Sequence, residues 1–375
     1  MKDHFDIGII GGGLAGLSLA IRLAEGGHSV CVLEKEKYPF HKVCGEYVSM
    51  ESYSYLEELG VPLSELSLPR INRLHLTSGN LELNAPLELG GFGISRYKLD
   101  DLLYKAAVKK GVSVNDGCKV MLIEDHAAEK TLITSHGVFY AGTVVGAHGK
   151  HSNMDKQLGR EFAIRSLEED SNYVGIKYHV EADLPPDLIE LHLFPSGYAG
   201  ISRIEDGKYC FCYLAKATEF KKHKSIAAFE DKVLTHNAVL KKYLQQHKRL
   251  WDKPVAISQF NFQRKSLAEG NTIMTGDSAG LISPVCGNGM SMALRSSQIL
   301  SRYLHRHLSG KEDLSQLLPQ YKREWNKEFA FRIQTGRALQ WLMEKKGLTQ
   351  PVLRFLKASP HFTRKIISLT HGKSF

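Results

Sequence analysis

The sequence predicts an α/β protein in which a domain built on a parallel sheet is split by an antiparallel sheet, with helices at the end of the chain. Two glycine-rich turns, each after an apolar run and before a helical pattern, occur far apart at residues 5–16 and 272–294. Between them, runs such as 173–180 and 209–214 alternate in polarity, which is typical of antiparallel strands. A domain that uses both turns must be discontinuous, with the antiparallel sheet inserted into it.

The first turn has the sequence FDIGIIGGGLAG and carries Gly11, Gly13 and Gly16 in the spacing G-x-G-x-x-G. Gly11 permits a tight turn after the strand, Gly13 lets the backbone approach a pyrophosphate, and Gly16 allows close packing of helix on strand. The helix expected over residues 17–25 then offers free N–H groups and a positive dipole end to phosphates. The turn therefore predicts a dinucleotide site, in which Ala15 is a further candidate contact.

A second apolar run, over residues 29–33, ends at Glu34. A carboxylate about 20 residues after the glycines binds ribose hydroxyls in such folds, and an acid there favours FAD or NAD over NADP. Lys35 follows it and is another candidate contact to the nucleotide. A glycine-rich turn can also serve packing alone, but here strand, helix, second strand and terminal acid agree.

In the second turn, TIMTGDSAGLISPVCGNGMSMAL, an apolar run reaches a Gly-Asp pair, and a loop with Pro284 leads to a Gly-Asn-Gly helix start. This pattern resembles the flavoprotein group that includes para-hydroxybenzoate hydroxylase and the geranylgeranyl reductases. The resemblance implies FAD as the cofactor, with Asp277 on the ribityl hydroxyls and the backbone of residues 287–290 near the pyrimidine end of the isoalloxazine. The implied contacts are Gly276, Asp277, Gly287, Asn288, Gly289 and Met290.

Residues 144–149, VVGAHG, followed by Ser152, resemble the family's G-A-D-G-x-x-S strand end, but His148 stands where an Asp is usual. In monooxygenases of the group that Asp is associated with flavin and pyridine nucleotide contacts. The electron donor therefore stays open between NAD(P)H and another reductant. Alternatively, His148 keeps the same loop through a hydrogen bond from its side chain to the backbone.

Two smaller segments fit the same group. Residues 93–107 resemble its R-x-x-L-D segment, in which Arg96 would meet the FAD phosphates at a helix start; a lone Arg before a helix can also be merely solvated. Residues 111–120 predict a third strand of the nucleotide-binding sheet and a turn. Val120 falls where the family contacts adenine through its backbone.

The segment HKVCGEYVS, residues 41–49, resembles the Lys-x-Cys-Gly segment of geranylgeranyl reductases through Lys42, Cys44 and Gly45. The resemblance implies cofactor contacts for these residues and places Cys44 near flavin and substrate, as proton donor or substrate contact. Packing beside the flavin is the alternative for Cys44.

Residues 197–214 predict a strand, a hairpin turn at Asp206-Gly207 and a second strand. In the relatives the equivalent Gly-Tyr strand lines the substrate cavity, which makes Tyr198 the second catalytic candidate. The family's downstream aromatic and Pro are missing here, which weakens the substrate assignment but not the fold.

The motif positions divide the chain into three parts. We expect a discontinuous Rossmann-like FAD-binding domain, an inserted antiparallel-sheet substrate domain and a region of basic amphipathic helices. The FAD-binding domain is expected over 1–70, 93–160 and 263–319, the substrate domain over 71–92 and 161–262, and the helical region over 320–375.

Residues 320–375 carry twelve Lys or Arg and three Glu, an excess equal to the formal net charge of +9 of the whole chain. Apolar residues at helical spacing predict amphipathic helices. These residues are Leu339, Leu342, Met343, Val352, Leu353, Leu356, Ile366 and Ile367. The helices either cap the substrate cavity with a solvated basic face, or dock on the inner face of an anionic membrane. Nucleic-acid binding is not expected, because no recognition motif accompanies the charge.

Composition is that of an ordinary globular protein. We expect a cytoplasmic protein, because the first strand starts near Met1 and no apolar run approaches the ~20 residues of a membrane span. The six cysteines show no paired metal spacing, so we expect free thiols and no metal.

The resemblance implies an FAD-dependent oxidoreductase that transfers hydride from reduced FAD to a C=C bond of a lipophilic, for example isoprenoid, substrate. The alternative in the same fold is an aromatic monooxygenase that hydroxylates a phenolic or resorcinol-type lipid. A flavin carrier without turnover is a third hypothesis. Halogenases share the fold, but their W-x-W-x-I-P segment is missing around Trp251, Trp325 and Trp341.

Overall fold

The computed structural model describes residues 4–126, 129–150, 152–165, 172–345 and 347–375. Its first sheet is built around strand β1 (His4–Ile10), which pairs in parallel with β2 (Val30–Leu33) and β9 (Gly137–Gly146). The strand order continues to β6 (Ser113–Asn115) on one side and to β17 (Thr272–Met274) and β16 (Ala268–Glu269) on the other. The carboxyl ends of the parallel strands meet at one edge, which is where a dinucleotide binds in such sheets.

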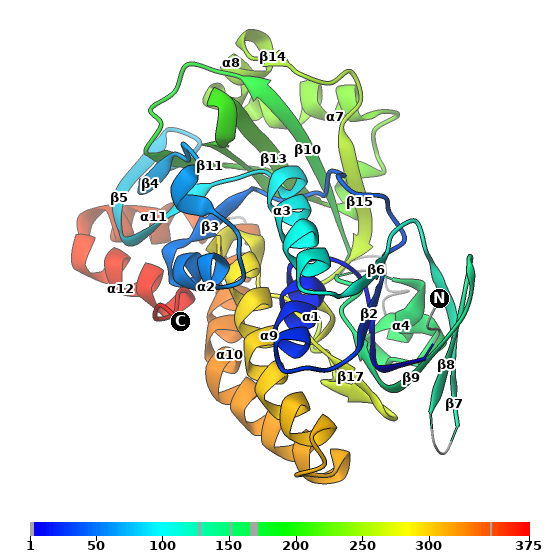
Figure 1. Ribbon diagram of the computed structural model, residues 1–375. Helices are drawn as coiled ribbons and strands as arrows, with labels where there is room; N and C mark the ends of the chain where they lie inside the picture. The colour runs from blue at the N-terminus through cyan, green and yellow to red at the C-terminus, as the bar shows by residue number, and fades with distance from the viewer. Residues whose placement is uncertain (1–3, 127–128, 151, 166–171, 346) are drawn as a thin grey trace.

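Helix α1 (Leu14–Glu25) begins directly after Gly13, three residues earlier than the sequence pattern predicted. It packs against α9 (Gly289–Leu308), where the hydroxyls of Ser18 and Ser297 lie 2.5 Å apart. Helix α3 (Arg96–Lys109) lies beside α1 (Figure 1). Apolar side chains of these helices and of β1 and β2 form the largest core of the molecule.

The second sheet lies beyond α3 and contains nine strands (Figure 1). Its main path is β14-β10-β13-β12-β11-β4-β5-β3, and β15 pairs with β10. The strands are β3 (Tyr47–Ser49), β4 (Arg70–Ser78), β5 (Leu81–Gly93), β10 (Tyr173–Glu181), β11 (Leu188–Phe194), β12 (Gly197–Arg203), β13 (Tyr209–Lys216), β14 (Lys248–Arg249) and β15 (Val255–Phe260). All pairs are antiparallel except β4 with β11, which run parallel. Strand β3 belongs to residues 1–70, which the sequence analysis assigns to the FAD-binding domain. The boundaries between the domains stay predictions.

The predicted turn at Asp206-Gly207 joins β12 to β13. Asp206 and Gly207 both have left-handed backbones, with φ of 57° and 72°, as a tight hairpin requires. The remaining elements are shorter. They are β7 (Val120–Asp125), β8 (Lys130–Thr134), α2 (Tyr53–Glu58), α4 (Asn153–Gln157), α5 (Glu161–Arg165), α6 (Ala217–Phe220), α7 (Ile226–Lys232), α8 (Ala238–Gln246) and the 3₁₀ turns Met50–Ser52, Leu63–Glu65, Glu205–Gly207, Leu234–His236, Gly276–Ser278 and Pro284–Cys286.

Three helices end the chain: α10 (Leu314–Glu344), α11 (Thr349–Ala358) and α12 (Pro360–Thr370). α10 runs along α9, while α11 and α12 pack on β5 at the edge of the second sheet (Figure 1). The predicted fold class, a discontinuous Rossmann-like domain with an inserted sheet and a helical C-terminal region, is confirmed. Among the described residues, no helix is both long enough and apolar enough to cross a membrane.

Candidate flavin and substrate site

The three glycine-bearing motifs come together in space. A Cβ placed on Gly276 would lie 2.6 Å from the Cβ of Ala15, so the first and second turns are in contact. The N–H of Gly149 donates to Ser278 Oγ at 2.8 Å, which ties the third motif to the second. The motifs are more than a hundred residues apart in sequence, and the folded chain makes one site of them.

The N-terminus of α1 faces two cations. A Cβ on Gly13 would lie 3.4 Å from Lys42 Nζ and 3.7 Å from a terminal guanidinium nitrogen of Arg96, and no other heavy atom beyond Gly13 and its chain neighbours is nearer. Free helix N–H groups and two positive side chains around a bare backbone are what a pyrophosphate requires. The space therefore fits the diphosphate of a dinucleotide.

Asp100, one turn further along α3, fixes both cations. Its carboxylate accepts two hydrogen bonds of 2.7 Å from the Arg96 guanidinium, and Lys42 Nζ lies 3.2 Å from Oδ2. Burial alone would raise the pKa of Asp100, but Arg96 and Lys42 outweigh it and hold the pKa below its usual value. The carboxylate stays charged, so it keeps the two cations aimed at the phosphate space. The sequence analysis did not single out Asp100, although it is the Asp of the R-x-x-L-D segment.

Glu34 is buried at the end of β2, as the ribose interpretation requires. The N–H of Gly12 donates to its Oε2 at 2.8 Å, which joins the carboxylate to the glycine turn. Lys35 is exposed and lies 3.7 Å from Glu36. Val120 is buried against Ile10 and Leu33 at the start of β7.

Asp277 lies in the turn that follows β17. Lys265, which sequence reasoning missed, donates to the backbone carbonyl of Asp277 at 2.9 Å and to that of Lys150 at 3.2 Å. Burial lowers the pKa of Lys265 to about 8. The ammonium group therefore holds the loop in place through these two backbone carbonyls. The Asp277 side chain forms no hydrogen bond to any other residue that the structure describes.

The helix start after Pro284 is held to the end of the chain. Gly287 has a left-handed backbone with φ of 65°, and Met290 is buried. Asn288 Nδ2 donates to the carbonyl of Thr370 at 2.8 Å. The side chain of Asn288 therefore links this turn to α12, and Gly289 follows as the first residue of α9.

His148 has a different hydrogen-bond partner from the one that the sequence suggested. Its Nε2 lies 2.9 Å from Asp155 Oδ1, and Arg160 donates to the same oxygen at 2.8 Å. The alternative in which the His148 side chain forms a hydrogen bond to the backbone was wrong, because its partner is the Asp155 carboxylate. The sequence could have suggested this, because Asp155 lies in the helix that the Ser152 cap begins.

Cys44 and Gly45 lie between the phosphate space and the second sheet. A Cβ on Gly45 would meet nothing within 4 Å, so the backbone there is open to a ligand. Cys44 is half-buried, and its carbonyl accepts a hydrogen bond from Cys210 Sγ at 3.2 Å. Cys210, one of the cysteines expected as free thiols, thus touches the Lys-x-Cys-Gly segment.

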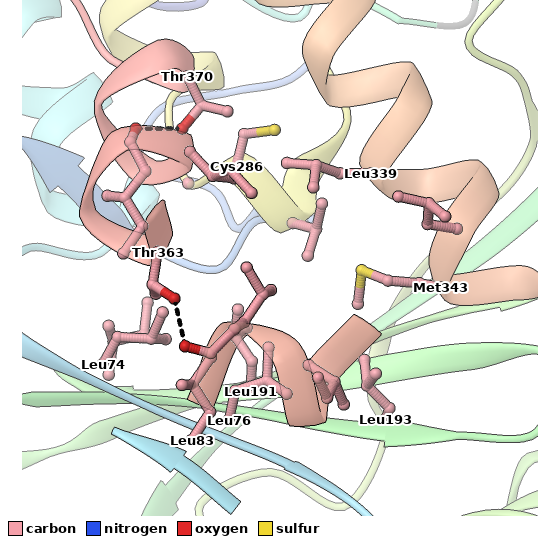
Figure 2. A pocket seen from close by; sticks show the side chains of 18 of the residues that line it. Leu74, Leu76, Leu83, Leu191, Leu193, Cys286, Leu339, Met343, Thr363 and Thr370 are labelled. Atoms are coloured by element: carbon pink, nitrogen blue, oxygen red, sulfur yellow. Dashed lines mark hydrogen bonds between the residues drawn. The ribbon is translucent and has the colours of Figure 1, made fainter. Parts of the chain in front are cut away.

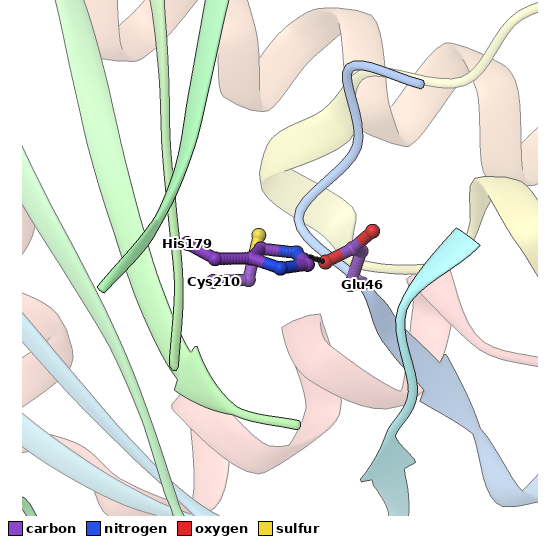
Figure 3. Close-up of side chains that lie close together, drawn as sticks. All are labelled: Glu46, His179 and Cys210. Atoms are coloured by element: carbon purple, nitrogen blue, oxygen red, sulfur yellow. Dashed lines mark hydrogen bonds and ion pairs between the residues drawn. The ribbon is translucent and has the colours of Figure 1, made fainter. Parts of the chain in front are cut away.

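The next residue, Glu46, is a fully buried carboxylate with a left-handed backbone, φ 57°. It is paired with the buried ammonium of Lys177 and accepts from the N–H of Arg96 at 2.7 Å. Its other oxygen lies 2.6 Å from His179 Nε2 (Figure 3). Glu46, His179 and Cys210 could converge on a metal ion, but Lys177 already supplies the balancing charge. Sequence reasoning missed this cluster, although Lys177 and His179 on one face of an apolar strand were a signal for it.

An apolar cavity of about 150 Å³ lies between strands β4, β5 and β11 and helices α10 to α12 (Figure 2). All eight apolar residues from which the sequence predicts amphipathic C-terminal helices line it. Cys286 and Gly287 of the second glycine turn are part of its wall. The cavity therefore borders the motif expected at the flavin ring.

Tyr198 lies beside this cavity and not in its wall. It packs in the same apolar cluster as Leu83, Leu193 and Leu356, which do line the cavity. Its hydroxyl is buried and has no hydrogen-bond partner among the described residues. Burial, with Cys212 and Cys286 nearby, raises the pKa of Tyr198, so the phenol stays protonated.

A family model described as FAD binding domain matches residues 4–330. The chain belongs to this FAD-binding family. The flavoprotein is also similar to three curated proteins, each over most of its length. It is 23% identical to digeranylgeranylglycerophospholipid reductase of Methanoculleus marisnigri, covering 87% of this chain and 82% of that protein. It is 22% identical to menaquinone reductase of Mycobacterium tuberculosis, covering 85% and 80%. It is 24% identical to FAD-dependent monooxygenase esdpE of Penicillium shearii, covering 86% and 75%.

Two solved structures show the same fold. A geranylgeranyl bacteriochlorophyll reductase-like protein from Thermoplasma acidophilum superimposes with a TM-score of 0.80 at 16% identity, covering all of this chain and 97% of that one. The halogenase PltM, solved with phloroglucinol and FAD, gives 0.75 at 15% identity, covering 97% and 85%. The resemblance to the geranylgeranyl reductases and FAD as the cofactor are confirmed, and the flavoprotein is an FAD-dependent oxidoreductase.

The residues present fit FAD. Gly13, Lys42 and Arg96 would hold the pyrophosphate, Glu34 the adenosine ribose and Asp277 the ribityl chain. Among the charged side chains of this set, that of Asp277 forms no hydrogen bond or ion pair with any other described residue and interacts with Arg96 and Lys265 through its charge alone, so we choose it for removal.

Asp277→Ala is expected to fold as the wild type does and to bind FAD roughly 10- to 100-fold more weakly. One hydrogen bond to a charged group contributes about 1.5–3 kcal/mol, and every 1.4 kcal/mol is tenfold in affinity. Titration of apoprotein by flavin fluorescence measures the change, with Asp183→Ala on an exposed loop as the control. An unchanged affinity would remove Asp277 from the site.

Proposed function

We propose that the flavoprotein reduces a C=C bond of a lipophilic substrate whose chain lies in the apolar cavity. The observation that carries this proposal is the position of the cavity: its wall consists mostly of leucines and other apolar side chains and includes Gly287 of the flavin motif. A leucine-lined cavity selects for hydrocarbon, because burial contributes about 25 cal/mol per Å² of apolar surface. The names of two curated relatives, a digeranylgeranylglycerophospholipid reductase and a menaquinone reductase, support a lipophilic substrate.

Reduced FAD, when bound, supplies a hydride to one carbon of the double bond. A proton must reach the other carbon, so that the C=C bond becomes a saturated C–C bond with two new C–H bonds. The chain's part is to exclude water, to orient the substrate and to hold that proton. We assign that proton to Cys44, which lies next to the open backbone of Gly45. Tyr198, whose buried hydroxyl has no hydrogen-bond partner among the described residues, packs beside the cavity and orients its wall.

The test is anaerobic. The protein is reduced with dithionite and mixed either with a polyprenyl lipid, with an alkylphenol, or with air, while the ~450 nm flavin band is followed and products are identified by mass spectrometry. Reoxidation by the polyprenyl lipid without oxygen, with a product two mass units heavier, is the expected result. Hydroxylation of the alkylphenol only in air would replace the proposal with the aromatic monooxygenase, which the similarity to a fungal monooxygenase favours.

Leu191→Trp is expected to lower turnover of a polyprenyl substrate roughly 5- to 30-fold while flavin content stays at the wild-type level. The larger ring would fill part of the cavity wall at β11, and displacing one or two buried methylenes already costs about 1–2 kcal/mol. The matched control is Leu89→Trp, at a position on β5 that is 38% exposed and outside the cavity. Equal rates in the two variants would show that the substrate does not use this cavity.

A further inference from the structure

The outer face of the helix pair α11–α12 carries two exposed aromatic rings. The side chains of Phe355 and Phe362 are 53% and 48% exposed, and their ring centroids are 5.3 Å apart, edge to face. Two large apolar rings packed on each other in solvent are unusual for a surface that stays in water. They form a small apolar wedge at the crest of the pair.

The same face is basic and lacks any acidic residue. Arg354, Lys357, Arg364 and Lys365 are exposed, and residues 349–370 contain no Asp or Glu. In the described part of the chain none of these four cations forms an ion pair. The contrast with the neighbouring helices is clear, because Arg302 of α9 pairs with a glutamate of α10. The positive charge of α11–α12 is therefore uncompensated.

The inner face of the pair belongs to the apolar cavity. Leu353 and Leu356 of α11 and Ile366 and Ile367 of α12 line it, opposite the two exposed rings. Helices α11 and α12 lie at the outside of the molecule (Figure 1), and the pair therefore separates the cavity from the surface. Figure 2 shows the cavity side. Whatever the outer face contacts lies one helix away from the cavity.

We propose that α11–α12 docks on an anionic phospholipid surface, with Phe355 and Phe362 inserted among the lipids and the four cations on their phosphates, and that the cavity receives its substrate from that bilayer. Basic residues with exposed aromatic rings on a short helix are the combination that binds a membrane interface. Each cation near an anionic surface contributes roughly fivefold to partitioning. The second half of the proposal rests on the proposed function; the docking itself does not.

The experiment uses the FAD-loaded full-length protein and sucrose-loaded vesicles that are sedimented. One set contains phosphatidylcholine with roughly 30% phosphatidylglycerol, and the other contains phosphatidylcholine alone; a charge-driven contact responds to this difference and to salt. The expected result is sedimentation with the anionic vesicles, little with the neutral ones, and a loss at high salt. Protein that stays in the supernatant of the anionic vesicles overturns the proposal.

Two double variants locate the contact. Lys357→Glu with Arg364→Glu is expected to lower partitioning at least 25-fold, at about fivefold for each cation lost, and Phe355→Ser with Phe362→Ser to lower it at least tenfold. The control, Lys241→Glu with Lys242→Glu, makes the same charge change on exposed positions of α8. A control that loses binding as strongly as the α11–α12 variants would show a diffuse charge effect and overturn the assignment.

A second readout separates this proposal from the proposed function. The docking variants should keep the wild-type rate of flavin reoxidation by a detergent-solubilised polyprenyl lipid and lose rate only when the lipid is presented in anionic vesicles. If vesicle binding behaves as expected but no polyprenyl lipid reoxidises the flavin, the docking stands and the proposed function fails. If the variants lose the detergent rate as well, the residues serve the cavity and not a membrane contact.

Discussion

Gly13→Val yields a folded protein without yellow colour. The backbone at Gly13 has φ −86° and ψ −168°, which a β-branched residue adopts without strain. The first added carbon approaches only the tips of Lys42 and Arg96, which are flexible side chains. The same carbon fills the space of the pyrophosphate, whose charge-assisted hydrogen bonds contribute about 1.5–3 kcal/mol each, so losing two of them weakens FAD binding by roughly 100-fold or more.

The measurement is the ratio of absorbance at ~450 nm to that at 280 nm after gel filtration, with circular dichroism to confirm the fold. Gly16→Ala is the instructive comparison, because its new Cβ would lie 1.9 Å from the carbonyl oxygen of Gly11 and disrupt the packing of helix on strand. Valine at position 13 should therefore abolish FAD binding in a folded protein, whereas alanine at position 16 should destabilise the fold itself. A Gly13→Val protein with full FAD occupancy would show that the pyrophosphate lies elsewhere.

Glu46→Ala is expected to lower the free energy of unfolding by about 3–5 kcal/mol, the cost of leaving a buried charge without its partner. The ammonium of Lys177 is fully buried and would lose its carboxylate, and His179 would lose its hydrogen-bond partner. Alanine brings no relief of the left-handed backbone at this position, since it is as strained there as glutamate. Urea unfolding of wild type and variant measures the difference.

The double variant Glu46→Ala with Lys177→Met should recover most of that loss, because removing both charges replaces an ion pair by apolar contacts, a change that is often nearly neutral. If the double variant is no more stable than Glu46→Ala alone, the lost stability comes from the shape of the turn and not from the charge.

The pH dependence of stability gives the same cluster a second signature. Burial would raise the pKa of Glu46, but Lys177 and His179 outweigh it and hold the pKa below its usual value. A carboxyl whose pKa is lower in the folded than in the unfolded state contributes stability that is present above the unfolded pKa and is lost as pH falls through the folded pKa. Stability should therefore fall in acid below about pH 4.5 in the wild type, and fall less steeply in Glu46→Ala.

The glycine motifs show which features of this protein can be predicted from its sequence alone. Gly13 and Gly287 can be interpreted from local sequence because the backbone conformation of a glycine-rich turn depends on a few neighbouring residues. The order of three such motifs then predicted FAD, a discontinuous domain and the family. The apolar faces of the C-terminal helices could also be predicted from the sequence, because side chains on one face of a helix recur every 3.6 residues whatever the helix packs against.

By itself, therefore, the sequence determined the cofactor, the fold class and the amphipathic character of the last helices. Only the tertiary structure decided that those helices enclose a cavity beside Gly287 and that Glu46 meets Lys177 and His179. The physical reason is range. A turn or a helical face is specified by residues close in the chain, whereas a buried ion pair joins residues more than a hundred positions apart, and its partners depend on how whole sheets and helices pack.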